Sequence, residues 1–268
     1  MEPMVNVALQ AARKAGELIV KAASKLDRIR VNEKSQHDYV SEVDRKAEEE
    51  IIYHLRKAYP DHRIICEESG IHEGSDTNSE WIIDPLDGTT NFLRGIPQYA
   101  VSIAYRHKGR LEHAVVYDPV KLEEFTASRG RGAQLNGSRI RVSARIDTAG
   151  ALYATGIPFS GKPFENMPSF LATMSALAEN SSGIRRMGAA SLDLAYVAAG
   201  RFDAFWEMHL QPWDIAAGVL LVKEAGGMVS DFQGGDRYLD SGHIVATTPR
   251  LLKPTLQTVR KHLGHLST

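Results

Sequence analysis

The sequence predicts a chain of two halves, an α+β half followed by an α/β half. Residues 1–142 contain two amphipathic helix patterns and then closely spaced strands, whereas strands and helices alternate through residues 143–268. Consecutive strands joined by short turns favour an antiparallel sheet, and alternating strands and helices favour an α/β arrangement. A length of 268 residues allows two modest domains that pack together, and we expect their boundary at residue 142.

The N-terminal half is predicted to open with a long helix. Pro3 suits the first helical position, and apolar residues then recur at helical spacing up to Ala22. The polar stretch from Asn32 to Asp38 is expected to be a loop. A second amphipathic helix follows Ser41, which precedes Asp44 in a pattern similar to a capping box.

Strands then follow one another up to residue 142. The apolar run from Trp81 to Ile83 is expected to end at Asp84, because Pro85 lacks the backbone N–H that a strand ladder uses. Ile64 and Ile65 predict a separate short strand that ends at Cys66. Later apolar runs, separated by turn sequences, predict a meander of antiparallel hairpins with strands at 100–106, 111–117, 123–127 and 139–142.

The C-terminal half is predicted to alternate strands with helices. Strands are expected at 151–155, 184–187, 204–206, 228–230 and 244–247. Helices are expected at 164–177, 188–198, from 213 to the Gly226-Gly227 stop, and at 251–263.

Composition excludes several classes of protein. A net charge of −1 gives no overall attraction to nucleic acid or to an acidic membrane, so we predict no direct nucleic-acid binding. The apolar runs are too short to span a bilayer, and the N-terminus has no signal pattern. Cys66 has no second cysteine to pair with, and its apolar neighbours favour a buried, inert thiol. We therefore expect a cytoplasmic protein with no membrane contact.

The stretch from Trp81 to Phe92, WIIDPLDGTTNF, carries the chemistry of the sequence. Asp84 and Asp87 leave an apolar strand together, and the carbonyl of Leu86 adds a third oxygen between them. Buried carboxylates need a cation, and hard oxygen ligands suit a divalent one. An ordinary Asp-Pro turn would explain the first aspartate and leave the second unexplained.

The next residues offer the complementary half of a phosphate site. Gly88 permits close backbone approach, and a helix or turn that opens at Thr89 directs N–H groups outward, which suits an anion. Carboxylates for a metal beside amides for a phosphate are what metal-assisted phosphate hydrolysis needs.

Two strings resemble the signatures of a known family. WIIDPLDGTTNF is similar to the first signature of the inositol monophosphatase family, and WDIAAGVLLVKEAGG, from Trp213 to Gly227, is similar to the second. The likeness extends over essentially the whole chain and is strongest to the bacterial SuhB type. It implies a layered α-β-α-β-α sandwich of the sugar phosphatase type, with an antiparallel sheet in the N-terminal half and a mixed sheet in the C-terminal half.

The resemblance also implies a metal site. Its ligands would hold two Mg²⁺ ions, with a third bound more weakly, and the positions that match are Glu67, Asp84, the carbonyl of Leu86, Asp87 and Asp214. Lys34 and Asp38 match residues near the weaker position, in a loop one residue shorter than in animal relatives. All-oxygen ligands favour magnesium over zinc. The resemblance further implies inhibition by lithium.

Three residues are assigned to catalysis through the resemblance, and they are Thr89, Asp44 and Glu67. Asp44 by itself is a first-turn charge that favours the helix dipole. The family pattern implies that Asp44 instead bonds the hydroxyl of Thr89, which helps to remove a proton from water. Asp214 is likewise either a helix N-terminal charge or a buried ligand that needs a cation.

The predicted substrate contacts come from both halves. The small residues Gly188 and Ala190 open a helix that either packs closely or faces a polyol, and Glu207 matches a family residue that accepts hydrogen bonds from ring hydroxyls. Arg186, like Arg185, is either solvated or holds anionic substrate. The remaining predicted contacts are Asp87, Gly88, Thr89 and Asp214.

The resemblance implies a Mg-dependent phosphomonoesterase that hydrolyses myo-inositol 1-phosphate and related polyol monophosphates. Fructose 1,6-bisphosphate and nucleotide 3′-phosphates are the alternative substrates. A second hypothesis is a non-catalytic main role, as a protein-binding factor of the ribosomal RNA transcription antitermination complex. The resemblance implies a homodimer.

Overall fold

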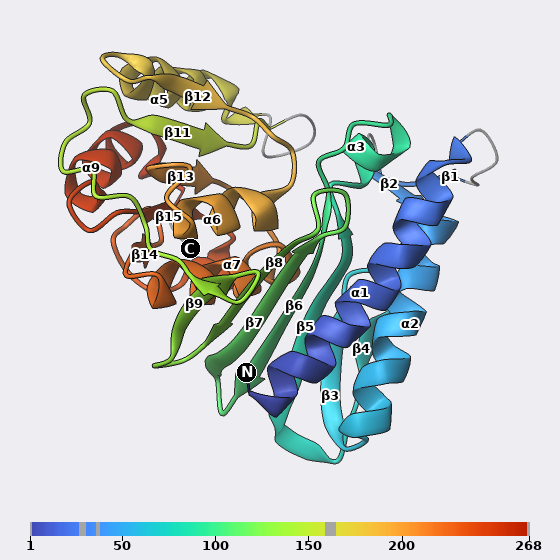
Figure 1. Cartoon of the computed structure of the whole chain (residues 1–268). Coiled ribbons are helices and arrows are strands. Elements are labelled where there is room, and N and C mark those ends of the chain that lie inside the picture. Colours follow the sequence, from blue (N-terminus) through green and yellow to red (C-terminus); the bar gives the residue numbers. More distant parts are fainter. Residues whose placement is uncertain (1, 27–30, 36–37, 159–164, 267–268) are drawn as a thin grey trace.

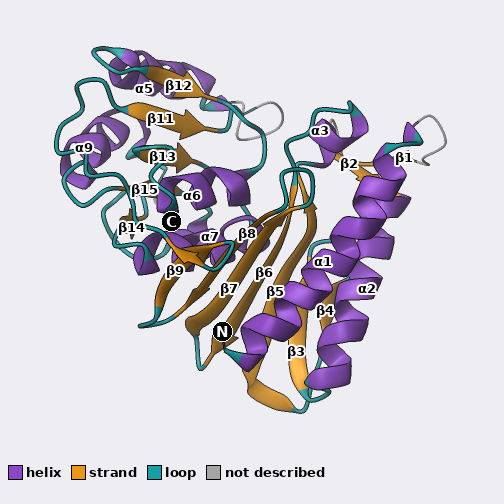
Figure 2. Cartoon of the chain, in the orientation of Figure 1, coloured by secondary structure: helices purple, strands orange, loops and turns teal. Residues whose placement is uncertain are grey.

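The computed structural model describes residues 2–26, 31–35, 38–158 and 165–266. Two sheets are separated and flanked by helices, so that the layers run α-β-α-β-α across the molecule (Figure 1). Coloured by secondary structure, the long strands of the larger sheet are seen with helices on both of its faces (Figure 2). The predicted layered fold is confirmed.

The first layer consists of the paired helices α1 (Pro3–Ala23) and α2 (Glu42–Ala58). An alanine-rich stripe of α1, which includes Ala8, Ala12 and Ala15, is fully buried. Small side chains let the two helices and the sheet below them approach closely.

The larger sheet has eight strands in the order β10-β9-β8-β7-β6-β5-β3-β4. The described pairs are antiparallel, as predicted for this half, except for the parallel pair β3 and β5. The strands are β3 (His62–Cys66), β4 (Gly70–His72), β5 (Asp76–Asp87), β6 (Ala100–His107), β7 (Arg110–Asp118), β8 (Glu123–Ser128), β9 (Gly132–Leu135) and β10 (Ser138–Arg139).

Strand β5 continues past the proline that was expected to end it. The expected end was Asp84, but the strand runs to Asp87. Its register against β6 shifts at this point, because Asp84 faces Ser102 while Asp87 faces Ala100. A bulge of this kind accommodates a proline, since the residue that lacks an N–H lies where ladder pairing is interrupted.

The smaller sheet has the strand order β12-β11-β13-β15-β14 and is mixed, as predicted. β11 runs parallel to β12 and β13, and β15 runs antiparallel to β13 and β14. The strands are β11 (Leu152–Thr155), β12 (Gly183–Arg185), β13 (Ala204–Glu207), β14 (Met228–Ser230) and β15 (Ile244–Thr247). The sheets fall on either side of residue 142, and the division into two domains there stays a prediction.

Helices α6 (Ala190–Ala198) and α7 (Pro212–Glu224) form the layer between the sheets. Helices α5 (Met167–Ala178) and α9 (Leu252–Leu263) cover the outer face of the smaller sheet, and the short helices α3 (Thr89–Leu93) and α8 (Tyr238–Ser241) lie in connections. The predicted start of α5 at residue 164 lies outside the described residues. None of the described helices is long and apolar enough to cross a membrane.

Within the segment expected to be a loop, from Asn32 to Asp38, the described residues belong to two paired strands instead. These strands, β1 (Val31–Ser35) and β2 (Asp38–Ser41), pair antiparallel. The prediction was wrong because polar composition was taken to indicate a loop, whereas backbone pairing of two polar strands needs no apolar face.

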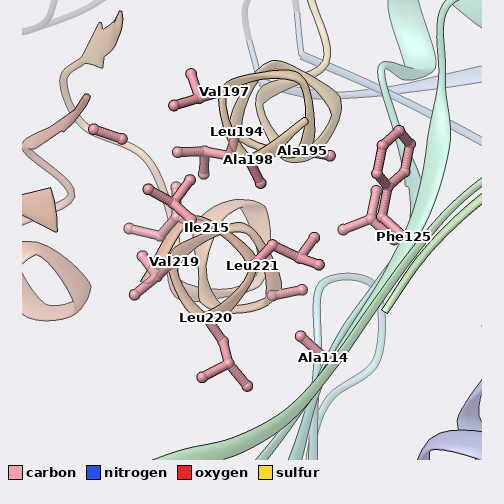
Figure 3. Packing of buried hydrophobic residues seen from close by; sticks show 14 of the residues in the cluster. Ala114, Phe125, Leu194, Ala195, Val197, Ala198, Ile215, Val219, Leu220 and Leu221 are labelled. Carbon is pink, nitrogen blue, oxygen red and sulfur yellow. The ribbon is translucent and has the colours of Figure 1, made fainter. Parts of the chain in front are cut away.

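The core between the sheets is continuous. Leu194 of α6 lies close to Ile215 of α7, and on the other side of these helices Phe125 of the larger sheet faces Ala195 and Leu221 (Figure 3). This arrangement places the N-terminal ends of α6 and α7 beside the end of β5.

Close packing of the two central helices depends on Gly218, where a Cβ atom would lie 2.5 Å from Leu194 Cβ. We expect Gly218→Val to lower the free energy of unfolding by about 2–3 kcal/mol, because the backbone-near atoms of Leu194 cannot rotate away. Urea denaturation measures this. Ser175→Ala, at an exposed position of α5, is the control and should change stability by less than about 0.5 kcal/mol. An unchanged midpoint for Gly218→Val would contradict the packing described here.

Candidate active site

A cavity of about 240 Å³ opens where the end of β5 meets the first turns of α6 and α7. Both halves of the chain contribute to its wall. The residues that line it are Glu67, Asp87, Gly88, Thr89, Thr90, Gly156, Arg186, Gly188, Ala189, Ala190, Glu207, Leu210 and Asp214.

Asp84 lies behind the cavity wall with 2% of its surface exposed. Its Oδ1 accepts a hydrogen bond of 2.9 Å from the N–H of Leu86 across the proline. Burial, and then the neighbouring carboxylates of Glu67, Asp87 and Asp214, raise the pKa of Asp84 well above its ordinary value. A carboxylate in this position gains strongly from any nearby cation.

Asp87 ends β5 and reaches across to the C-terminal half. Its Oδ2 accepts hydrogen bonds from the backbone N–H of Ser191, at 2.7 Å, and from the Ser191 hydroxyl. Burial raises the pKa of Asp87 to about 6, while the bonds from Ser191 act in the opposite direction. The side chain is thereby fixed between the two sheets.

Thr89, at the start of α3, connects the cavity to α2. Its hydroxyl lies 2.8 Å from Oδ1 of Asp44 and 3.1 Å from the carbonyl oxygen of Leu86. Asp44 is fully buried in the first turn of α2. A single hydroxyl proton serves one of these acceptors at a time, and its oxygen can still accept a further hydrogen bond.

Asp214 occupies the first turn of α7, which begins at Pro212. Its Oδ2 accepts a hydrogen bond of 2.7 Å from the N–H of Gln211, as in a capping box. The backbone of the neighbouring Trp213 is anchored to the larger sheet, because its carbonyl accepts a bond from the hydroxyl of Ser102. Burial, and then Asp87, raise the pKa of Asp214 well above its ordinary value.

Glu207, Gly156 and Arg186 form another part of the cavity wall. Gly156 makes room for the carboxylate, because a Cβ atom there would lie 1.7 Å from Oε1 of Glu207. Burial raises the pKa of Glu207 to about 8, and the charge of Arg186 acts against that rise. This part of the wall therefore offers both an acceptor and a cation to polar groups of a ligand.

Three residues near the cavity were not predicted from the sequence. Ser191 holds Asp87, and Asn91 donates hydrogen bonds of 2.8 Å to the carbonyls of Gln98 and Met187, which ties α3 to the segment before α6. Asp193 is 1% exposed, and its Oδ1 has no hydrogen-bond partner among the described residues. Asn91 lies within the WIIDPLDGTTNF stretch, so its place in that motif could have indicated a role near the site.

The model of the inositol monophosphatase family matches residues 1–264. The chain belongs to the inositol monophosphatase family. It is 59% identical over 265 residues to a Pseudomonas aeruginosa protein named Nus factor SuhB, and 52% identical over 264 residues to the Escherichia coli K12 protein of the same name. In each case the match covers 98% of both chains. The resemblance found in the sequence, including its bacterial SuhB type, is confirmed.

Solved structures of inositol monophosphatase family members have the same fold. The extragenic suppressor protein suhB of Bartonella henselae matches with a TM-score of 0.94 at 44% identity, over 98% of this chain and all of that one. An inositol monophosphatase of Thermotoga maritima matches with a TM-score of 0.88 at 33% identity, over 99% of this chain and all of that one.

The structure brings most of the predicted site residues of this family member to one cavity. The predicted residues that do not line it are Asp84, Leu86 and Asp44, which lie behind the lining residues. Asp84 accepts a hydrogen bond from Leu86, and Asp44 accepts one from the lining residue Thr89. Lys34 and Asp38 lie on the β1–β2 hairpin, and their side chains are outside the described part of the chain.

The donors suit a hard divalent cation, although the carboxylates are not arranged around one point. Within the described residues no three His, Cys, Asp or Glu side chains are placed to hold a metal ion. One oxygen each of Asp84, Asp87 and Asp214 is occupied by a hydrogen bond. The other oxygen of each carboxylate does not take part in these bonds. Buried acidic groups that raise one another's pKa values, with oxygen atoms alone as donors, fit Mg²⁺ better than zinc.

The acidic cluster should make the metal-free protein sensitive to pH. Burial raises the pKa of Glu207 to about 8 and raises those of Asp84 and Asp214, so the folded chain keeps protons that the unfolded chain has lost. Its melting temperature should therefore fall, by roughly 2–5 °C, between about pH 7 and about pH 8. The pKa values of His209 and His243 are lowered, so these histidines titrate below this window.

Differential scanning fluorimetry in EDTA measures this fall, and Glu207→Gln should reduce it because the neutral side chain no longer titrates. Added Mg²⁺ should oppose it, since a cation favours the charged carboxylates. A metal-free melting temperature that rises through the window would contradict the assignment of these carboxyl groups as buried and protonated.

Proposed function

We propose that this inositol monophosphatase family member is a Mg-dependent phosphomonoesterase that hydrolyses myo-inositol 1-phosphate and related polyol monophosphates. The observation that carries the proposal is a single cavity. At this cavity lie an acidic cluster from both halves, a hydroxyl bonded to a buried carboxylate, and the polar residues Glu207 and Arg186. These are the parts that metal-assisted hydrolysis of a phosphate ester requires.

The acidic cluster would hold two Mg²⁺ ions, with a third bound more weakly. The ligands proposed are Glu67, Asp84, the carbonyl oxygen of Leu86, Asp87 and Asp214, all near the end of β5 or the start of α7. When bound, Mg²⁺ supplies positive charge to the phosphate and lowers the pKa of a water molecule. The carboxylate oxygens that already accept hydrogen bonds would either lose these bonds or stay out of the metal coordination. Where the bonds are lost, part of the metal-binding free energy is used for this rearrangement.

Thr89 is proposed to take part in removing the proton of the attacking water. Its hydroxyl is bonded to the buried carboxylate of Asp44, so a proton that arrives at Thr89 can be matched by transfer of the hydroxyl proton to Asp44. The water oxygen then attaches to phosphorus, the bond from phosphorus to the ester oxygen breaks, and a second water protonates the alkoxide that leaves, which gives the alcohol.

The polar part of the cavity wall supports a polyol monophosphate as substrate. Glu207 can accept hydrogen bonds from ring hydroxyls, and Gly188 and Ala190 line the same cavity. Bound Mg²⁺ would favour the charged form of Glu207, so a second phosphate in this place would meet a carboxylate, which disfavours fructose 1,6-bisphosphate. Arg186, which also lines the cavity, can hold an anionic part of the substrate.

Phosphate release tests the proposal. The purified chain is assayed on myo-inositol 1-phosphate, fructose 1,6-bisphosphate and a nucleoside 3′,5′-bisphosphate, with Mg²⁺ and with EDTA. We expect the highest kcat/KM on the inositol ester and no activity in EDTA. A higher kcat/KM on either of the other two substrates would change the substrate assignment, and activity in EDTA would overturn the metal-dependent mechanism.

Two substitutions of Thr89 sharpen this test. Thr89→Val keeps the shape but lacks the hydroxyl, and should lower kcat by about 10²–10⁴-fold, the usual contribution of a positioned proton acceptor. Thr89→Ser keeps the hydroxyl and is the matched control, with most of the activity retained. Equal rates for the two variants would remove Thr89 from the mechanism.

The names of the relatives favour a second role, as a protein-binding factor of ribosomal RNA transcription antitermination. Proteins called Nus factor SuhB are 59% and 52% identical to this chain over nearly its whole length. The two roles are compatible, since a binding surface and a catalytic cavity can occupy different parts of one molecule. We also propose inhibition by lithium, a homodimer and a cytoplasmic location.

A pull-down with purified antitermination factors separates the roles. Asp87→Asn removes a proposed metal ligand and should abolish phosphatase activity while the outer surface stays intact. We expect the variant to bind the factors as the unmodified chain does, measured by band intensity or by surface plasmon resonance. If neither form binds, the second role has to be withdrawn. If the variant alone fails to bind, the cavity and the partner surface are coupled.

A further inference from the structure

The N-terminus of α6 lacks a capping side chain of its own. The helix begins at Ala190, and the preceding residue, Ala189, makes no side-chain hydrogen bond to it. Alanine is a poor N-cap residue because it offers no oxygen to the unpaired N–H groups of the first turn. Another group has to bind these donors, since the first turn of α6 is buried.

Asp87 from the other half of the chain binds them. The N–H of Ser191 lies 2.7 Å from Oδ2 of Asp87, and the backbone of the neighbouring Ala190 also acts to lower the pKa of this carboxylate. The two partners, Asp87 and Ser191, are separated by 104 positions in the sequence. A carboxylate is well suited to this position because it accepts hydrogen bonds and its charge is favourable at the positive end of the helix dipole.

The hydroxyl of Ser191 adds a second donor to the same oxygen, Oδ2 of Asp87. Serine in a helix often bonds a carbonyl of its own preceding turn, but here the hydroxyl bonds across to the other half. Ser191 is fully buried, so water does not compete for this contact. The carboxylate is therefore fixed in rotation, with Oδ2 occupied and Oδ1 left out of both bonds.

We propose that Ser191 is a positioning residue for Asp87, which fixes this carboxylate so that it binds Mg²⁺ through Oδ1. The inference rests on the proposed function, because it assumes that Asp87 is a metal ligand. A ligand already held in its binding orientation loses less conformational freedom when the metal binds. The same contact joins Asp87 to α6. Gly188, just before this helix, and Ala190, its first residue, are proposed to contact the polyol.

Direct metal binding tests the proposal without substrate. Isothermal titration of the full chain with Mg²⁺ gives its Kd, and we expect Ser191→Ala to bind about 5–10-fold more weakly, since it loses the hydroxyl and keeps the backbone N–H. The Mg²⁺ concentration for half-maximal phosphatase activity should rise by the same factor, while kcat at saturating Mg²⁺ stays within about twofold. A merely structural role would lower the melting temperature and leave the Kd unchanged.

Two further variants complete the experiment. Ser230→Ala removes another buried serine hydroxyl, which has no hydrogen-bond partner within the described residues and does not line the cavity, and its Kd should equal that of the unmodified chain. Ser191→Cys keeps a side chain of similar size with a weak donor, and should bind with an intermediate Kd. It replaces Ser191→Ala as the deciding variant if circular dichroism shows that Ser191→Ala is unfolded.

The outcomes distinguish this inference from the function on which it rests. If the unmodified chain does not bind Mg²⁺, the proposed function fails. If the unmodified chain binds Mg²⁺ and the deciding Ser191 variant binds it equally well, the positioning role of Ser191 is overturned while the proposed function stands.

Discussion

Acidic side chains from both halves are buried beside one another at the end of β5, and the rest of the fold has to hold them there. Each raises the pKa of its neighbours, so their proximity costs free energy unless protons or cations compensate. Hydrogen bonds from Leu86, Ser191 and Gln211 lower that cost by stabilising the charged forms. Packing of α6 and α7 between the sheets keeps the halves in place around this cluster.

Much of the fold could be predicted, because helical periodicity and turn sequences are local signals. The alanine-rich stripe of α1 and the Gly226-Gly227 stop of α7 are examples that the structure contains. The continuation of β5 through Pro85 could not be predicted, since the bulge depends on how β6 pairs with it. The β1–β2 hairpin was missed for a related reason, as two polar strands stabilise each other mainly through backbone pairing.

The candidate site was predictable where its residues stand together in the sequence, as from Asp84 to Thr89. It was not predictable where the partner is distant. Ser191 reads as an ordinary first-turn residue until Asp87, 104 positions earlier, is found to bond it. Gly156 similarly gains its meaning from the carboxylate of Glu207, which fills the space that a side chain would occupy. The sequence indicates which chemical groups are present, whereas their mutual contacts depend on the tertiary fold.

Helix α7, which bears Asp214, also packs against the larger sheet. A single hydrophobic cluster includes Val219 of α7, Phe125 of the larger sheet and Phe205 of the smaller one. Pulling the sheets apart would expose many such side chains, at about 1.5–3 kcal/mol each. Hinge opening between the sheets is therefore costly. A ligand that reaches this cavity has to enter and leave while the two sheets keep their places.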